Sequence, residues 1–141
     1  MSVRSERILN FPHECLGRGC MAKIIIIDDE KGLCEEFRDI LQEDGHDVDV
    51  AHNGPDGLLK IEETEYDIAF VDILMPRMDG TEVFSRIKKI RNMPVVIMSG
   101  FLPPGKGRQI MAMGCDAVLR KPLDLKQVIK IVNEKTAKKS G

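Results

Sequence analysis

Four short apolar segments of the sequence each end in polar side chains that could do chemistry together. In chain order, these polar residues are Asp28 with Asp29, then Asp72, Ser99 and Lys121. Carboxylates that are crowded together repel one another unless a cation is present. Mg²⁺ suits such a set, because it prefers oxygen ligands and is commonly held by one or two carboxylates together with a phosphate. The residue types therefore predict a magnesium site that handles a phosphoryl group.

One carboxylate of this set could act as a nucleophile and form an aspartyl phosphate, and Asp72 is the candidate. Lys121 would compensate the remaining negative charge and donate hydrogen bonds to the phosphoryl group. Ser99 offers a hydroxyl to another phosphoryl oxygen. The metal and the lysine would both stabilise charge on the group being transferred. Taken singly, each residue has an ordinary alternative: Asp28 and Asp29 could cap a helix, and Asp72 could be a solvated strand end.

The elements that must position these residues can be predicted from hydrophobic periodicity. Strands are expected at residues 23–28, 47–51, 67–72, 94–99 and 115–120, and helices at residues 31–44, 55–65, 80–91, 106–113 and 125–135. The segment Ile24 to Ile27 is apolar on both faces, as a central parallel strand should be. Strands that alternate with helices predict an α/β fold, with a five-stranded parallel sheet flanked by five helices. Ligands of such sheets bind beyond the carboxyl ends of the strands, where all the candidate residues fall.

Size and composition are consistent with one ordinary globular domain. The chain has 141 residues and a formal net charge of −2, so it carries no strongly basic surface of the kind that binds nucleic acid. No apolar stretch approaches the roughly 20 residues that span a bilayer. The four cysteines form no paired framework, which favours reduced thiols and a cytoplasmic location.

The first twenty residues differ from the rest, because they show neither helical nor strand periodicity. We expect residues 1–20 to be a flexible extension and residues 21–141 to form the domain. A zinc site built on Cys15 and Cys20 with His13 nearby is an alternative, but Cys15 and Cys20 alone would need two more ligands. The chain ends soon after the last predicted helix, so a domain without an attached output domain is expected.

The chain resembles the receiver domain of two-component response regulators over about residues 22–139. The motifs that carry the resemblance are Asp28-Asp29, the run from Asp72 through Pro76 to Asp79-Gly80, Ser99-Gly100 and Lys121-Pro122. Each motif is weak alone, but together, in this order and at these strand ends, they are very specific. The resemblance implies a flavodoxin-like, CheY-like three-layer sandwich with strand order 2-1-3-4-5.

The resemblance also implies a role for each matching residue. Asp72 would accept a phosphoryl group from a sensor histidine kinase or a histidine phosphotransfer protein. Asp29 and Asp72 would bind Mg²⁺ directly, together with the backbone carbonyl of Leu74, while Asp28 would act mostly through a water. Ser99 would close on the phosphoryl group, and Lys121 would pair with it.

Further implications concern the backbone and the output of the domain. The peptide bond between Lys121 and Pro122 would be cis, as is usual in the family. Phosphorylation would switch contacts with a downstream protein, with no direct binding to nucleic acid or membrane. The chain would be a signalling switch rather than an enzyme, catalysing only its own phosphotransfer and dephosphorylation.

One position departs from the family pattern, and two other classes of protein stay open. Family members commonly carry Tyr or Phe three residues before the lysine, where this chain has Val118, which puts the usual aromatic rotamer switch in doubt. A phosphorylation-independent, degenerate receiver that serves as an interaction module is one alternative. An aspartate-nucleophile phosphohydrolase is a weaker one, because such enzymes typically show Asp-x-Asp where Asp28 and Asp29 are adjacent.

Overall fold

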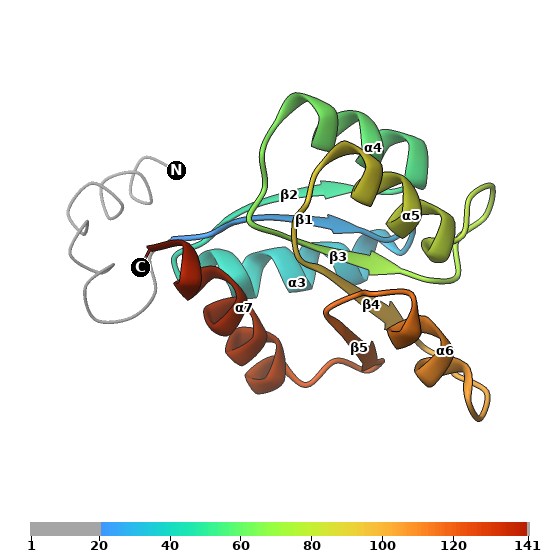
Figure 1. Cartoon of the computed structure of the whole chain (residues 1–141). Helices are drawn as coiled ribbons and strands as arrows, with labels where there is room; N and C mark the ends of the chain where they lie inside the picture. Colours follow the sequence, from blue (N-terminus) through green and yellow to red (C-terminus); the bar gives the residue numbers. More distant parts are fainter. Residues whose placement is uncertain (1–20, 141) are drawn as a thin grey trace.

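The chain folds around a central parallel sheet, seen in a computed structural model that describes residues 21–140. The strands are β1 (Lys23–Ile27), β2 (Asp47–Ala51), β3 (Ile68–Asp72), β4 (Val95–Ser99) and β5 (Ala117–Arg120). All neighbouring strands pair in parallel, in the order β2-β1-β3-β4-β5 (Figure 1). The predicted fold class and strand order are therefore confirmed. The expected extension at residues 1–20, including the alternative zinc site, lies outside the described residues.

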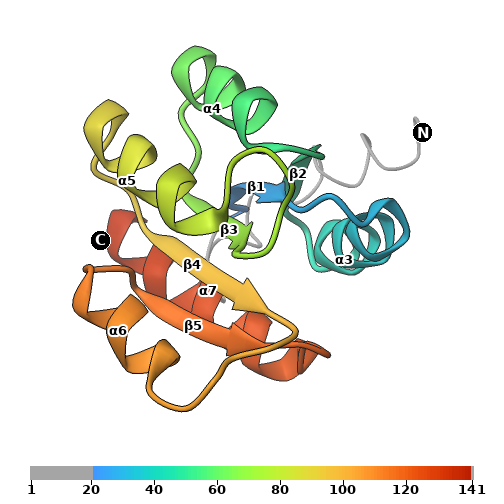
Figure 2. The same ribbon diagram turned by 90° about the vertical axis from the view of Figure 1, so that its right-hand side faces the viewer.

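Five helices cover the two faces of the sheet. They are α3 (Lys31–Glu43), α4 (Gly54–Glu63), α5 (Gly80–Ile90), α6 (Lys106–Ala112) and α7 (Leu125–Ser140). Helices α4 and α5 lie side by side on one face, and α3 and α7 lie on the other, with α6 beside the edge strand β5 (Figures 1 and 2). None of the helices in the described part of the chain is long and apolar enough to cross a membrane.

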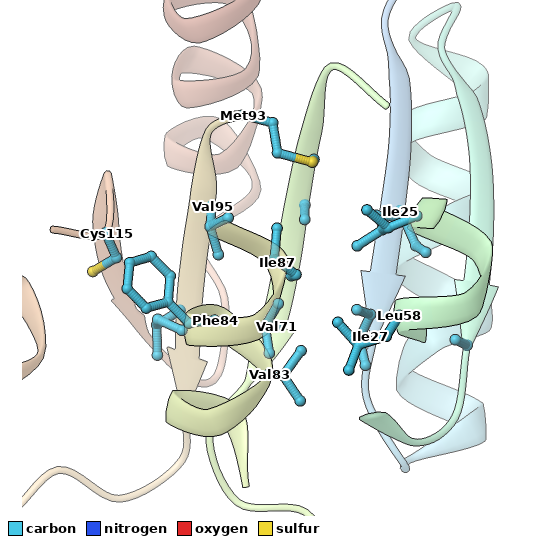
Figure 3. Close-up of a cluster of buried hydrophobic side chains, with 14 of the residues drawn as sticks. Ile25, Ile27, Leu58, Val71, Val83, Phe84, Ile87, Met93, Val95 and Cys115 are labelled. Carbon is cyan, nitrogen blue, oxygen red and sulfur yellow. The ribbon is translucent and has the colours of Figure 1, made fainter. Parts of the chain in front are cut away.

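Two separate apolar cores form because successive side chains of a strand point to opposite faces. Ile25 and Ile27 of β1 face α4 and α5, where they pack in the cluster drawn in Figure 3. Ile24 and Ile26 face α3 and α7 and pack in a second cluster. This burial on both sides explains why the central strands read as continuous apolar runs rather than as alternating ones.

The ends of several elements differ from the sequence-based prediction by a few residues. Helix α4 begins at Gly54, one residue before Pro55, because the side chain of Asn53 caps it by accepting a hydrogen bond from the backbone N–H of Asp56. It ends at Glu63 because Thr64 is already extended. Helix α7 continues to Ser140, five residues beyond the predicted end at residue 135.

Candidate functional site

The carboxyl edge of the sheet brings the three predicted aspartates together. Asp28 and Asp29 follow β1 directly, and Asp72 is the last residue of β3, the strand that pairs with β1. One carboxylate oxygen of each lies within 4.8 Å of the others. Asp28 and Asp72 are buried, whereas Asp29 is exposed. The cluster is thus a shallow acidic site with one side open to solvent.

The loop that follows Asp72 is anchored by the start of helix α5. Asp79 caps this helix, since its side chain accepts hydrogen bonds from the backbone N–H groups of Thr81 and Glu82. The N–H of Gly80 donates to the carbonyl of Ile73 over 2.8 Å. A Cβ atom at position 80 would lie 2.5 Å from the backbone oxygen of Asp72, so only glycine allows the helix to approach this closely.

Lys121 reaches into the acidic cluster from the end of β5. Its Nζ lies 2.8 Å from Asp28 Oδ2, 3.5 Å from Asp72 Oδ1 and 3.2 Å from Glu30 Oε1. The peptide bond that joins Lys121 to Pro122 is cis. Sequence reasoning missed Glu30, because an exposed glutamate beside a helix start is common and its contact with Lys121 joins residues far apart in the chain.

Burial and charge set the protonation of the site. Burial and the neighbouring charge of Asp28 raise the pKa of Asp72 to about 6, although Lys121 and the backbone N–H of Leu74 oppose the change. Burial alone would lower the pKa of Lys121, but its contacts with Asp28, Asp72 and Glu30 outweigh burial and raise it. Lys121 is therefore a permanent cation at neutral pH. Any further positive charge nearby would stabilise the ionised form of Asp72 and lower its pKa.

The donor set fits a magnesium ion. The three aspartates offer only oxygen atoms, which are the ligands that Mg²⁺ prefers. The set differs from a zinc site, which is typically built from sulfur and nitrogen ligands. One lysine balances one of the three carboxylates, so the cluster retains uncompensated negative charge next to a buried acid. A divalent cation would stabilise the ionised carboxylate of Asp72 against both burial and the repulsion by Asp28, which together raise its pKa.

Ser99 lies at the same edge of the sheet, but its hydroxyl is occupied elsewhere. The Oγ atom donates a hydrogen bond to the carbonyl of Phe101 over 2.7 Å and accepts one from the N–H of Phe101 over 3.1 Å. The side chain is buried at the end of β4. Ser99 thus holds its own loop, and it would have to leave both partners before it could reach a group bound to Asp72.

The remaining predicted positions border the site or lie behind it. Leu74 follows β3 by two residues and is 60% exposed, and Phe101 is 67% exposed. Val118 pairs with Ile97 across β4 and β5 and is partly buried against the core shared with α4 and α5. The position that commonly holds an aromatic ring in receivers is filled here by a small side chain packed inward.

Of the two thiols in the described part of the chain, the one beside the acidic cluster is unreactive. Cys34 of α3 is fully buried, and its Sγ donates to the backbone carbonyl of Asp28 over 3.2 Å. Burial and the charge of Asp28 raise the pKa of the Cys34 thiol to about 12. Because the thiolate is the reactive form of cysteine, burial keeps Cys34 in its unreactive thiol form, and its hydrogen bond to Asp28 supports the loop.

The stability of the metal-free protein should depend on pH through Asp72. Its pKa in the folded state, about 6, lies above the ordinary value of 3.8, so the fold favours the protonated form. The stability that belongs to this group is fully present below about pH 4 and is lost as the pH rises through 6. We expect the difference in unfolding free energy between Asp72→Asn and the unmodified protein to grow by on the order of 2 kcal/mol over this range, in favour of the variant.

This dependence can be measured by urea unfolding in the presence of a chelator, from pH 4 to pH 8. Comparison of the two proteins cancels the contributions of the other titrating groups. Unfolding free energies of the two proteins that change in parallel with pH would contradict the expectation. Added Mg²⁺ should flatten the difference, because the ion stabilises the ionised carboxylate.

Comparisons with known proteins agree with the fold. Residues 24–133 match the family model described as the response regulator receiver domain. Protein PilG of Pseudomonas aeruginosa is 35% identical over 113 residues, covering 76% of this chain and 82% of PilG. A homolog of the transcriptional regulatory protein CpxR from Haemophilus influenzae is 31% identical over 114 residues, or 77% of this chain. The chain spans about half (48%) of the length of that relative.

Solved structures show the same resemblance in three dimensions. A receiver domain protein from Clostridium thermocellum superimposes with a TM-score of 0.80 at 29% identity, covering 85% of this chain and 98% of that one. The response regulator TrrA of Thermotoga maritima, in complex with Mg(2+)-BeF, has a TM-score of 0.73 at 27% identity over 82% of this chain and 99% of its own. The chain belongs to the response regulator receiver domain family. Receiver domains are signalling switches of two-component systems, they interact with histidine kinases and downstream targets, and they typically bind Mg²⁺.

Proposed function

We propose that this receiver accepts a phosphoryl group on Asp72 from the phosphohistidine of a sensor histidine kinase or a histidine phosphotransfer protein. The observation that carries the proposal is the convergence of Asp72 with Asp28, Asp29 and Lys121 at one edge of the sheet. A buried carboxylate with an amine 3.5 Å away and two further carboxylates beside it is arranged for metal-assisted phosphoryl transfer.

The reaction forms one bond and breaks one bond. An oxygen of the ionised Asp72 attacks phosphorus, the O–P bond forms and the P–N bond to the donor imidazole breaks. The imidazole nitrogen leaves with the electron pair and takes up a proton. Hydrolysis later reverses the state of Asp72, since water attacks phosphorus, inorganic phosphate leaves and the carboxylate is restored.

The residues around Asp72 divide the remaining work. Asp29 and Asp72, with Asp28 acting mostly through a water and with the backbone carbonyl of Leu74, would hold Mg²⁺. The bound ion supplies positive charge for the phosphoryl oxygens. Lys121 donates hydrogen bonds to the same oxygens from the side of β5.

The switch follows from the position of Ser99. When its hydroxyl turns toward the phosphoryl group, both hydrogen bonds to Phe101 break, and the loop between β4 and α6 is released. The face formed by α6, β5 and α7 would then present a different surface to a downstream protein in the cytoplasm. The small Val118 leaves this response to the backbone and the loop rather than to an aromatic ring. Phosphorylation works as a population shift between two surface states.

Intact-mass measurement tests the proposal directly. The protein is incubated with Mg²⁺ and a small phosphodonor such as acetyl phosphate, and one added phosphoryl group is expected. The adduct should be absent in Asp72→Asn and present in the matched control Asp39→Asn, which removes an exposed carboxylate of α3. A folded protein that forms no adduct would contradict the proposal and favour a phosphorylation-independent interaction module. Steady turnover of phosphate monoesters would favour a phosphohydrolase.

A further inference from the structure

Glu30 has a fixed backbone and an exposed side chain at the mouth of the acidic cluster. Its N–H donates to Asp28 Oδ1 over 3.0 Å, and its carbonyl accepts the N–H of Cys34 over 3.0 Å. As the N-cap residue of α3, it makes no side-chain capping hydrogen bond. Its carboxylate instead turns back to Lys121, with Oε1 3.2 Å from Nζ, and its side chain is 63% exposed.

The ammonium group of Lys121 is surrounded by three carboxylates, and those of Asp28 and Glu30 accept hydrogen bonds from it. It has three N–H donors, and the carboxylates of Asp28, Glu30 and Asp72 lie 2.8, 3.2 and 3.5 Å from Nζ. The donor that faces Asp72 can pass directly to a phosphoryl oxygen on that residue. A second hydrogen bond from Lys121 to the phosphoryl group requires the contact with Asp28 or with Glu30 to give way.

Exposure decides which of the two carboxylates yields. The side chain of Asp28 is 1% exposed, so no water can replace Lys121 there, and a buried carboxylate without its cation is strongly unfavourable. Water can solvate the exposed carboxylate of Glu30 as soon as Lys121 leaves it. The contact with Glu30 is therefore the one that exchanges, while the contact with Asp28 persists.

We propose that Glu30 is a positioning residue that holds one donor of Lys121 toward the mouth of the site and competes with the phosphoryl group for it. The proposal rests on the phosphorylation of Asp72 proposed above. Glu30 holds the lysine outward in the resting protein, and its negative charge also opposes an incoming phosphoryl group. Both effects favour the unphosphorylated state, so Glu30 lowers the affinity of the site for a phosphoryl group.

Binding of beryllofluoride with saturating Mg²⁺ tests this competition at equilibrium, because beryllofluoride imitates a phosphoryl group. Glu30→Gln keeps the size of the side chain and removes its charge, and it should bind beryllofluoride about threefold more tightly, as expected for an exposed ion pair. The matched control is Glu35→Gln on the same helix, whose exposed carboxylate has no hydrogen bond or ion pair with any residue the structure describes. That control should change the affinity by much less.

A second measurement follows the ammonium group itself in metal-free protein. The NMR signals of the Lys121 side chain should move in Glu30→Gln and stay in place in Glu35→Gln. Equal affinities and equal Lys121 signals in the two variants would overturn the role of Glu30. If the unmodified protein binds no beryllofluoride and forms no adduct on Asp72, the proposed function fails instead, so the two failures can be told apart.

Discussion

Replacing Gly80 by alanine is expected to lower the free energy of unfolding by about 3 kcal/mol and to remove most phosphorylation of Asp72. The added Cβ would lie 2.5 Å from the backbone oxygen of Asp72 and 2.5 Å from Cα of Ile73. Both neighbours are backbone atoms, so neither can rotate away as a side chain would. The start of α5 and the end of β3 must move apart, and the nucleophile moves with β3.

The control for this prediction is Gly32→Ala in helix α3. A Cβ at position 32 meets nothing within 4 Å, and alanine favours helix over glycine, so this variant should gain up to about 1 kcal/mol. Urea unfolding gives both changes, and intact mass after treatment with a phosphodonor gives the loss of the adduct. Normal stability and normal phosphorylation of Gly80→Ala would show that α5 does not need this close approach.

Replacing Lys121 by methionine should cost about 4 kcal/mol of unfolding free energy at neutral pH without metal. Methionine preserves the length of the side chain and removes its cation. Asp28, whose side chain is 1% exposed, then loses its nearest positive charge, 2.8 Å away, and faces Asp72 unscreened. Folding must either bury an unpaired carboxylate or bind a proton, and both cost free energy.

The reason for the loss can be separated from a simple packing defect. Adding Asp28→Asn to Lys121→Met should restore much of the stability, because the uncompensated charge is gone. Mg²⁺ should do the same for the single variant by supplying positive charge. Lys130→Met, at an exposed position of α7, should be nearly neutral. If neither the second substitution nor Mg²⁺ restores stability, the charge argument is wrong.

The fold and the edge of the sheet at which the polar residues gather could be predicted from the sequence, because both depend on patterns that the sequence displays. The apolar run of β1 predicts a buried strand, and the helical spacing of the apolar residues in α5 predicts a helix. Polar residues at the ends of parallel strands then meet at one edge whatever the details of packing. The positions of Asp28, Asp29 and Asp72 at strand ends therefore predict that the three side chains lie together, as they do in the structure.

Features that depend on which partner a side chain chooses could not be predicted in the same way. Nothing in the spacing of Glu30 shows that its carboxylate folds back onto Lys121 rather than into solvent. The sequence also gives no sign of the hydrogen bond between Ser99 and the backbone of Phe101, because a serine before a glycine is compatible with many turns. The backbone of Arg77, with φ of 71°, is a third case, since its sequence offers no glycine to signal a left-handed turn.

The two hydrogen bonds between Ser99 and Phe101 carry a thermodynamic consequence for signalling. If each is worth about 1 kcal/mol, the arrangement with a free Ser99 hydroxyl makes up only about 3% of the resting population. A ligand that needs the free hydroxyl binds with its affinity reduced to that fraction of its intrinsic value. The hydrogen-bonded loop would thus keep most of the unphosphorylated protein in the resting state. Any partner that breaks these hydrogen bonds would raise the affinity of the domain for a phosphoryl group.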